Sequence, residues 1–467
     1  MAGRDQMTAS SRISEKFGSL PGPARRTLRL LAIYIVLILV FVLSLTAVFA
    51  LPQGRIVRNI RGSLARLKAE GPHPYIIVGN STFRLDNYDD AHWLDIAIVT
   101  QPGGPLVNAM AMYNGRNSPQ PIEVLENDLN GPRVGAVGYS YYWHGYQVFL
   151  RPALVAFNYG EIRYLNLLLA GMLVGITIII AARVAGPLAA GVLTFALAFS
   201  GFWSVPITLN YVSDMYLMLI GSIVVLLWAD RPASFRSHAV EVFFVIGMLT
   251  SFFDNLTNPM ITIGIPLALA LAVFAAREPA RKASRDVLFA LSSMVAWAVG
   301  YVASWVTKWA IGTLVLRENV FRAGINQFLF RAGATGAGPR PLDSIRWNVG
   351  DLFPLIQPKR PGGVLLLILI VAVIVVLLLL WRRPGAQIRR VLPVLTVAPL
   401  PFVYYVVASN MTLIHHWIMY RTLVVTVFSV TYVVLASIDF PRLGEKLGLG
   451  PEGHRHDERG LDSAELG

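Results

Sequence analysis

The chain contains no cysteine, and only 14% of its 467 residues are charged. The missing cysteines exclude a disulfide framework, a thiolate metal site and a cysteine nucleophile. A soluble domain carries about 25% charged residues, so the low charge excludes a single water-soluble globule. Lysine is scarce as well, because only six of the 40 basic residues are lysines.

Long apolar runs take the place of the missing charges. Hydrophobic residues make up 55% of the chain, and a helix needs about 20 mostly apolar residues to cross a bilayer. The sequence therefore predicts an all-α polytopic membrane protein with about ten transmembrane helices. The ten windows lie at about 29–50, 164–182, 186–204, 212–229, 239–254, 259–276, 287–311, 363–381, 391–409 and 417–438.

The positions of the basic residues predict the orientation of these spans. Arginines and lysines lie before the first span and in alternate short connections, whereas the short connections 205–211, 255–258 and 410–416 have none. By the positive-inside rule both termini are cytoplasmic. The net charge of +13 thus reflects topology, and no nucleic-acid partner is expected. The arginine-rich, lysine-poor composition is typical of a GC-rich genome and favours a bacterial plasma membrane.

The chain divides into membrane-embedded and extramembrane segments. Two long connections, 51–163 and 312–362, fall on the extracytoplasmic side in this topology. The predicted order is a cytoplasmic segment 1–28, the first transmembrane helix 29–50, an extracytoplasmic loop 51–163 with amphipathic helices and an acidic motif, transmembrane helices two to seven within 164–311, the second long extracytoplasmic loop 312–362, transmembrane helices eight to ten within 363–438, and a partly disordered cytoplasmic tail 439–467.

The first long loop contains the acidic motif RLDNYDDAHWLD. Like charges crowded together favour a nearby cation, metal or substrate, and crowding raises the pKa of one carboxylate toward that of a general base. Asp89 and Asp90 are therefore the candidate catalytic residues, and Asp86 a candidate contact for sugar or acceptor. The alternative interpretation is a solvated acidic loop without a role in chemistry.

An aromatic segment, SYYWHGYQVFLRP, ends the same loop. Aromatic faces stack on sugars, so His144, Trp143 and Tyr142 are candidate sugar or acceptor contacts, together with Trp93 of the acidic motif. An aromatic belt at the membrane interface explains the same residues equally well. Asp214 and Asp254, at the outer ends of spans four and five, complete the set of candidate acceptor contacts.

Cations also gather on the extracytoplasmic side. In SNMTLIHHWIMYR, Arg421 lies about one turn inside the last span, and arginine presents a fixed fork of donors suited to phosphate oxygens. His416, His415 and Lys308 are further candidates for binding a phosphate. The alternative for Arg421 is snorkelling toward lipid headgroups. The two histidines are adjacent, so their side chains diverge on a helix, and no metal site is predicted.

The second long loop has the composition of a lid. An amphipathic helix is predicted over residues 316–331, and the glycine-rich GATGAGPRP follows it. Flexible hinges beside charged helices are typical of loops that close over a substrate. A plain surface loop is the alternative.

The layout resembles that of the membrane-embedded glycosyltransferases of the GT-C type. The resemblance covers the whole chain as architecture: about ten spans, a long first outer loop with an acidic residue, and a later outer loop that closes on the donor. NYDDAHWLD, YYWHGYQVFLRP and HHWIMYR also resemble segments of multi-pass proteins from Gram-positive bacteria. One departure is that the acidic pair follows the first span by almost forty residues.

The resemblance implies an enzyme that moves a hexose or pentose from a polyprenyl-phosphate donor to a glycan or glycolipid acceptor of the cell envelope. It implies inversion at the anomeric carbon, with Asp89 or Asp90 as base and with Arg421 and His416 at the phosphate. No cofactor is required, although the carboxylates are compatible with a divalent metal. The alternatives are a transporter or flippase for lipid-linked sugars and a non-enzymatic scaffold or sensor. A transporter is disfavoured because the middles of the spans have almost no charge.

Overall fold

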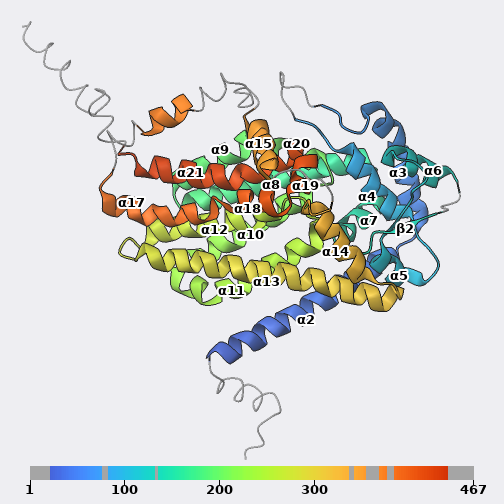
Figure 1. The fold of residues 1–467 in the computed structure, drawn as a ribbon, viewed down its shortest axis with the longest axis horizontal. Coiled ribbons are helices and arrows are strands. Elements are labelled where there is room, and N and C mark those ends of the chain that lie inside the picture. Colours follow the sequence, from blue (N-terminus) through green and yellow to red (C-terminus); the bar gives the residue numbers. More distant parts are fainter. Residues whose placement is uncertain are drawn as a thin grey trace, which may run out of the picture.

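The computed structural model describes residues 22–75, 83–131, 135–335, 341–353, 368–375 and 383–439. These residues form an all-α polytopic fold, and long helices lie side by side over most of its length (Figure 1). Eight helical stretches within the described residues are long and apolar enough to cross a membrane. They are α2 (Gly22–Phe49), α8 (Tyr159–Val184), α10 (Val212–Ala229), α11 (Pro232–Phe253), α12 (Pro259–Arg277), α13 (Ala283–Leu316), Gly385–Val407 and His416–Ser437.

The last two stretches are each built from several short helices. The first contains α17 (Gly385–Val391), η2 (Leu392–Val397) and α18 (Leu400–Val407), whereas the second contains α20 (His416–Met419), η3 (Tyr420–Leu423) and α21 (Val424–Ser437). A further short helix, α19 (Ser409–Ile414), joins them. In the stretch Gly385–Val407, prolines at positions 393, 399 and 401 lack a backbone N–H donor. Their absence from the hydrogen-bond ladder favours short helical pieces over one continuous helix.

Two of the ten predicted spans are not among these eight. The window 186–204 forms α9 (Pro187–Phe199), which has 13 residues and is thus about 20 Å long, short of the roughly 30 Å of a hydrocarbon core. The helix ends because Gly201 adopts a left-handed conformation with φ of 72° and the 3-10 helix η1 (Phe202–Ile207) follows. The window 363–381 lies outside the described residues except for 368–375.

The first long connection forms a helical layer at one end of the bundle (Figure 1, right). Its helices are α3 (Gln53–Glu70), α4 (Asn87–Ile98), α5 (Gly104–Ala111), α6 (Pro121–Asn130) and α7 (Gln147–Ala156). Strand β1 (Tyr113–Asn114) pairs antiparallel with β2 (Val137–Gly138). The amphipathic helix α3 buries Ile56, Ile60 and Leu67 and packs against α4, α6 and α7. The second connection adds α14 (Val320–Arg331) and α15 (Pro341–Leu352).

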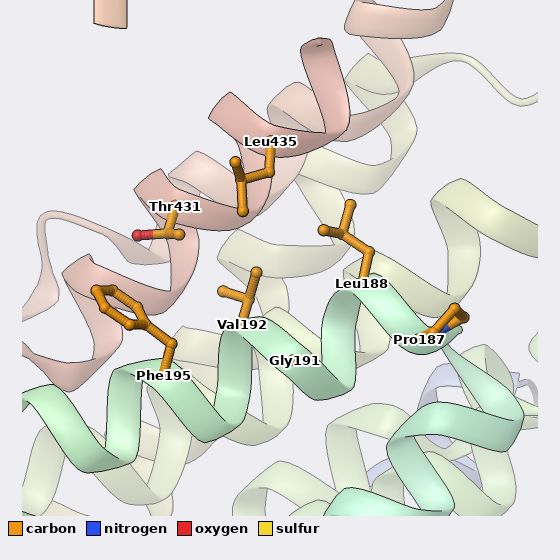
Figure 2. A pocket seen from close by; sticks show the side chains of 7 residues that line it. All are labelled: Pro187, Leu188, Gly191, Val192, Phe195, Thr431 and Leu435. Carbon is orange, nitrogen blue, oxygen red and sulfur yellow. The ribbon is translucent and has the colours of Figure 1, made fainter. Parts of the chain in front are cut away.

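Helices α9 and α21 leave a shallow apolar cavity of about 510 Å³ between them. Leu188, Val192 and Phe195 of α9 face Thr431 and Leu435 of α21 (Figure 2). Phe195 is 48% exposed, and no charged side chain lines the cavity. An apolar surface of this kind is stable in contact with lipid chains, which is the environment that the composition of the helices requires.

Helices α11 and α13 approach each other most closely at two glycines. A Cβ on Gly247 would lie 2.0 Å from the carbonyl oxygen of Trp297, and a Cβ on Gly300 would lie 2.3 Å from that of Phe244. Small residues at a crossing of this kind let the two backbones pack directly against each other. This contact joins α11 and α13 directly, backbone against backbone.

We therefore expect Gly247→Ala and Gly300→Ala each to destabilise the protein by about 1–3 kcal/mol, because the added methyl group has no space. Thermal unfolding in detergent measures the effect. Gly62→Ala is the matched control, since a Cβ on this α3 glycine meets nothing within 4 Å, and alanine is the better helix former. Unfolding temperatures of both bundle variants equal to that of the wild type would contradict the packing.

Candidate functional site

The acidic motif covers the N-cap and most of α4, and Asp86, Asp89 and Asp90 lie at its N-terminal turn. Asp86 is the N-cap, and its side chain accepts a hydrogen bond from the backbone N–H of Asp89 at 3.2 Å. Carboxylates are stabilised at this end of a helix by the unpaired N–H groups and by the helix dipole. The local reason for the motif is thus helix initiation, and any chemical role depends on what surrounds each carboxylate.

Asp90 is fully buried. Its carboxylate accepts hydrogen bonds from the Tyr159 hydroxyl and from the backbone N–H of Leu209, the latter at 2.9 Å. The Arg163 guanidinium donates to the same tyrosine and to Glu70. Burial raises the pKa of Asp90 to about 7, although the positive charge of Arg163 opposes this shift. Asp90 therefore joins α4 to α8 and to the segment before α10.

Asp89 lies on the more open side of the same turn. Asn210 donates from its amide nitrogen to Asp89 at 2.7 Å and to Asp86 at 3.0 Å. Asp86 is buried, and burial together with the charges of Asp89 and Asp90 raises its pKa well above the usual value. Asp89, by contrast, is half-buried. Of the three carboxylates, Asp89 is the one that keeps some exposed surface.

The charge of Asp89 acts on groups from several elements. His73 follows α3, His92 lies on α4, and His415 follows α19. Burial lowers the pKa of each histidine, to about 4 for His92, and the negative charge of Asp89 opposes the shift in all three. A histidine held neutral in this way donates a hydrogen bond from one ring nitrogen and accepts one at the other, without adding positive charge. Asp89 is therefore the electrostatic centre of this region.

Arg421 lies in η3 and is held by a serine hydroxyl and two backbone oxygens. It donates to Ser204 Oγ at 2.8 Å and more weakly to the carbonyl oxygens of Gly201 and Ile418, at 3.4 and 3.5 Å. Gly201 permits this close packing, because a Cβ there would meet Phe83 at 2.6 Å. No carboxylate lies within 4.0 Å of Arg421 in the described part of the chain.

Tyr211 lies close enough to both Arg421 and the acidic motif for their charges to act on its hydroxyl. Burial raises the pKa of Tyr211 well above its usual value, the charges of Asp86 and Asp89 raise it further, and the charge of Arg421 lowers it. The same phenol thus lies in Coulombic range of both carboxylates and of the arginine. His73 also packs edge-on against Trp417, four residues before Arg421, at 5.0 Å. The acidic motif and the last helical stretch therefore border one region.

The other predicted phosphate contacts have protein partners. His416 Nδ1 is hydrogen-bonded to the Asp351 carboxylate, which joins α20 to α15. Lys308 is buried, donates to the carbonyl oxygen of Met110 at 2.7 Å and lies 5.5 Å from the Trp143 ring. Lys308 thus satisfies a carbonyl at the C-terminal end of α5. His415 is half-buried, and Asp89 influences its pKa.

The predicted sugar contacts form a packed aromatic cluster. Trp143 donates to the carbonyl oxygen of Ser304 at 3.0 Å. His144 has partners at both ring nitrogens, the Tyr146 hydroxyl and the Tyr139 carbonyl oxygen, each at 3.0 Å. Burial lowers the pKa of His144 well below its usual value. Tyr142 stacks on Trp305, and Trp93 packs against His144. The cluster borders the acidic motif through Trp93, which follows Asp90 on α4.

Asp214 and Asp254 form a second carboxyl pair at the ends of α10 and α11. Both are buried, and their side chains interact with each other. Asp254 also accepts from the backbone N–H groups of Thr257 and Asn258, at 2.6 and 3.3 Å. Burial raises the pKa of Asp254 to about 6. Two carboxyl groups buried this close together disfavour each other's ionised form, and their contact links the adjoining ends of α10 and α11.

Arg331, in the last turn of α14, is a cation that the sequence reasoning did not select. Its Nη1 contacts Met411 Sδ, and its buried Nε has no hydrogen-bond partner in the described part of the chain. Burial lowers the pKa of Arg331, but the charges of Tyr142, Tyr139 and Asp89 outweigh it and raise the pKa overall. Asn210 and Tyr211 were also missed, because nothing in the sequence distinguishes them from other loop residues.

The described residues contain no group of three or more histidine, aspartate and glutamate side chains that could hold a metal ion. What the site offers is one half-buried carboxylate, half-buried histidines with lowered pKa values and two arginines that lack a carboxylate partner within 4.0 Å among the described residues. The chain matches no protein-family model, and neither a curated protein nor a solved structure is significantly similar to it.

The raised pKa of Asp90 makes the free energy of unfolding depend on pH. Its pKa of about 7 in the folded protein exceeds that of an unfolded aspartate, about 3.9. The folded state therefore binds more protons between these values, so the stabilisation is complete below about pH 4 and is lost as the pH rises through 7. The slope of the unfolding free energy against pH reports the difference in bound protons between the unfolded and folded states. We expect Asp90→Asn to reduce this difference by up to about one proton. Glu123→Gln, at an exposed residue of α6, is the control; an unchanged slope in Asp90→Asn would refute the assignment.

Proposed function

We propose that the protein is a membrane-embedded glycosyltransferase that uses a polyprenyl-phosphate sugar and works at the extracytoplasmic face, with Asp89 as its general base. The observation that carries the proposal is the difference between three neighbouring carboxylates: Asp86 and Asp90 are buried, whereas Asp89 is half-buried. A general base must reach the hydroxyl that it deprotonates. Asp89 meets this requirement and Asp90 does not. Of the two candidate bases that the sequence offered, we therefore propose Asp89.

The surrounding charges support transfer from a phosphate leaving group. Arg331 and Arg421 both lack a carboxylate within 4.0 Å in the described residues, and both lie in Coulombic range of groups that Asp89 also influences. An arginine without a counter-ion is suited to a phosphate oxyanion. Fixed cations are most effective where negative charge develops in the transition state, which is the leaving phosphate oxygen.

The reaction then follows from these positions. Asp89 accepts the proton of an acceptor hydroxyl while that oxygen forms a bond to the anomeric carbon. The bond from the anomeric carbon to the phosphate oxygen breaks, and polyprenyl phosphate leaves with its electron pair, next to the arginines. Attack opposite the leaving group inverts the anomeric centre. The acceptor is a glycan or glycolipid of the cell envelope, and the step requires no metal ion.

The position of the site at one end of the helix bundle favours this function over transport. Asp89, His415 and Arg331 belong to α4, the α19–α20 junction and α14, which lie toward the end of the bundle that holds the helical layer (Figure 1). A transporter needs its polar groups near the middle of the membrane. A lipid-borne substrate instead needs a site that its headgroup reaches from the membrane surface.

The test uses purified protein and a panel of polyprenyl-phosphate hexoses and pentoses labelled in the sugar. Release of labelled sugar to water or to added envelope glycolipid measures transfer. We expect Asp89→Asn to lower the rate at least about 100-fold, the contribution typical of a general base, with little change in unfolding temperature. Glu123→Gln is the matched control, since this carboxylate is exposed on α6. Undiminished transfer by Asp89→Asn would remove the base, and sugar movement across vesicles without transfer would favour a flippase.

A further inference from the structure

A second cavity lies far from Asp89, between α2, α10 and α11. Its volume is about 680 Å³. Its polar lining residues are Arg29, Trp228, His238 and Glu241, and the rest of the lining is apolar or glycine. The arginine lies in the first third of α2, and Trp228 and His238 flank the α10–α11 connection. The polar end therefore faces the side at which α2 begins, which the arginine distribution predicts to be cytoplasmic.

Glu241 lines this cavity and is only 8% exposed. Neither of its carboxylate oxygens has a hydrogen-bond partner among the described residues. The nearest cation in an ion pair is Arg26, with Nε 3.8 Å from Oε1, and the Arg26 side chain is 48% exposed. A buried carboxylate without donors is costly. A molecule that brings N–H donors into the cavity removes this cost.

Two arginines at the same end provide the opposite charge. Arg29 lines the cavity, and Arg26 lies one turn earlier on α2 and donates to the carbonyl oxygen of Ser237 at 3.2 Å. Residues three apart share one face of a helix. The end of the cavity therefore combines a carboxylate with guanidinium groups. This charge pattern complements a zwitterion that has both an ammonium group and a phosphate.

The rest of the cavity has the size and polarity of an acyl-chain groove. It continues from Glu241 along α11 to Leu249, eight residues that span about 12 Å. One leaflet contributes about half of the roughly 30 Å hydrocarbon core. On α10 the lining runs from Trp228 to Leu217, which is a similar length. The apolar part thus reaches about as deep as one leaflet.

We propose that this cavity is a specific site for a glycerophospholipid with a primary ammonium headgroup, of the ethanolamine class, in the leaflet at which α2 begins. The ammonium group donates to Glu241, the phosphate accepts from Arg29 and Arg26, and one acyl chain lies between α10 and α11. A choline headgroup has no N–H to donate. A glycerol headgroup brings net negative charge to the buried carboxylate without an ammonium group.

The experiment measures lipid retention in the purified full-length protein after exchange into mixtures of phosphatidylethanolamine, phosphatidylcholine and phosphatidylglycerol with identical acyl chains. Native mass spectrometry counts the bound lipids. We expect the wild type to retain the ethanolamine lipid about tenfold or more over the choline lipid, and Glu241→Gln to lose this preference. Asp230→Asn is the matched control, because Asp230 is a carboxylate at the same end of α10 that pairs with Arg277 and does not line the cavity.

A second measurement does not depend on a variant that folds. The thermal stability of the wild type is compared in ethanolamine lipids whose nitrogen carries zero, one, two or three methyl groups. Stabilisation should fall steadily as N–H donors are lost. Equal retention and equal stabilisation across the series, or an undiminished preference in Glu241→Gln, would overturn the proposal. Neither readout involves glycosyl transfer, so the result is independent of the function proposed for Asp89.

Discussion

The buried hydrogen-bond network around Asp90 is the constraint on which the site depends. Asp90, Tyr159, Arg163 and Glu70 come from α4, α8 and α3, and they join the outer helical layer to the bundle. Buried charges of this kind are stable only when each one has partners. Every member here has them, so the network fixes α4 in position. The first turn of α4 then holds Asp89 at a defined place.

This arrangement gives neighbouring carboxylates different tasks. Asp86 initiates the helix, and Asp90 anchors it against α8. Asp89 is left half-buried and shares Asn210 with Asp86. A site built on a rigid helix end is more precise than one on a free loop. The aromatic cluster around His144 has a similar supporting function, since it packs against α4 through Trp93.

Much of the architecture follows from the sequence, because hydropathy and the absence of charge directly reflect the solvent of a membrane helix. The window 186–204 shows the limit: its composition predicts a span, but the left-handed turn at Gly201 ends α9 early. The acidic motif was identifiable as well. The choice between Asp89 and Asp90 was not, because it depends on Tyr159 and Leu209, which are distant in sequence.

The phosphate-binding candidates show the same limit more clearly. Lys308 and His416 have the right charge and lie in segments that the sequence predicts to be near the extracytoplasmic side, but their partners Met110 and Asp351 belong to other elements. Arg331 was missed because an arginine in the last turn of an amphipathic helix usually caps that helix and faces solvent. Only the packing of α14 against α19 places its guanidinium beside Met411.

The absence of cysteine makes the central claim directly measurable. In Asp89→Cys the introduced thiol is the only one in the chain, so a membrane-impermeant maleimide reports its exposure in intact cells or sealed right-side-out vesicles. We expect modification from outside and protection by a polyprenyl-phosphate sugar. Modification only after the membrane is permeabilised, or a rate unaffected by the lipid-linked sugar, would contradict an extracytoplasmic site at Asp89.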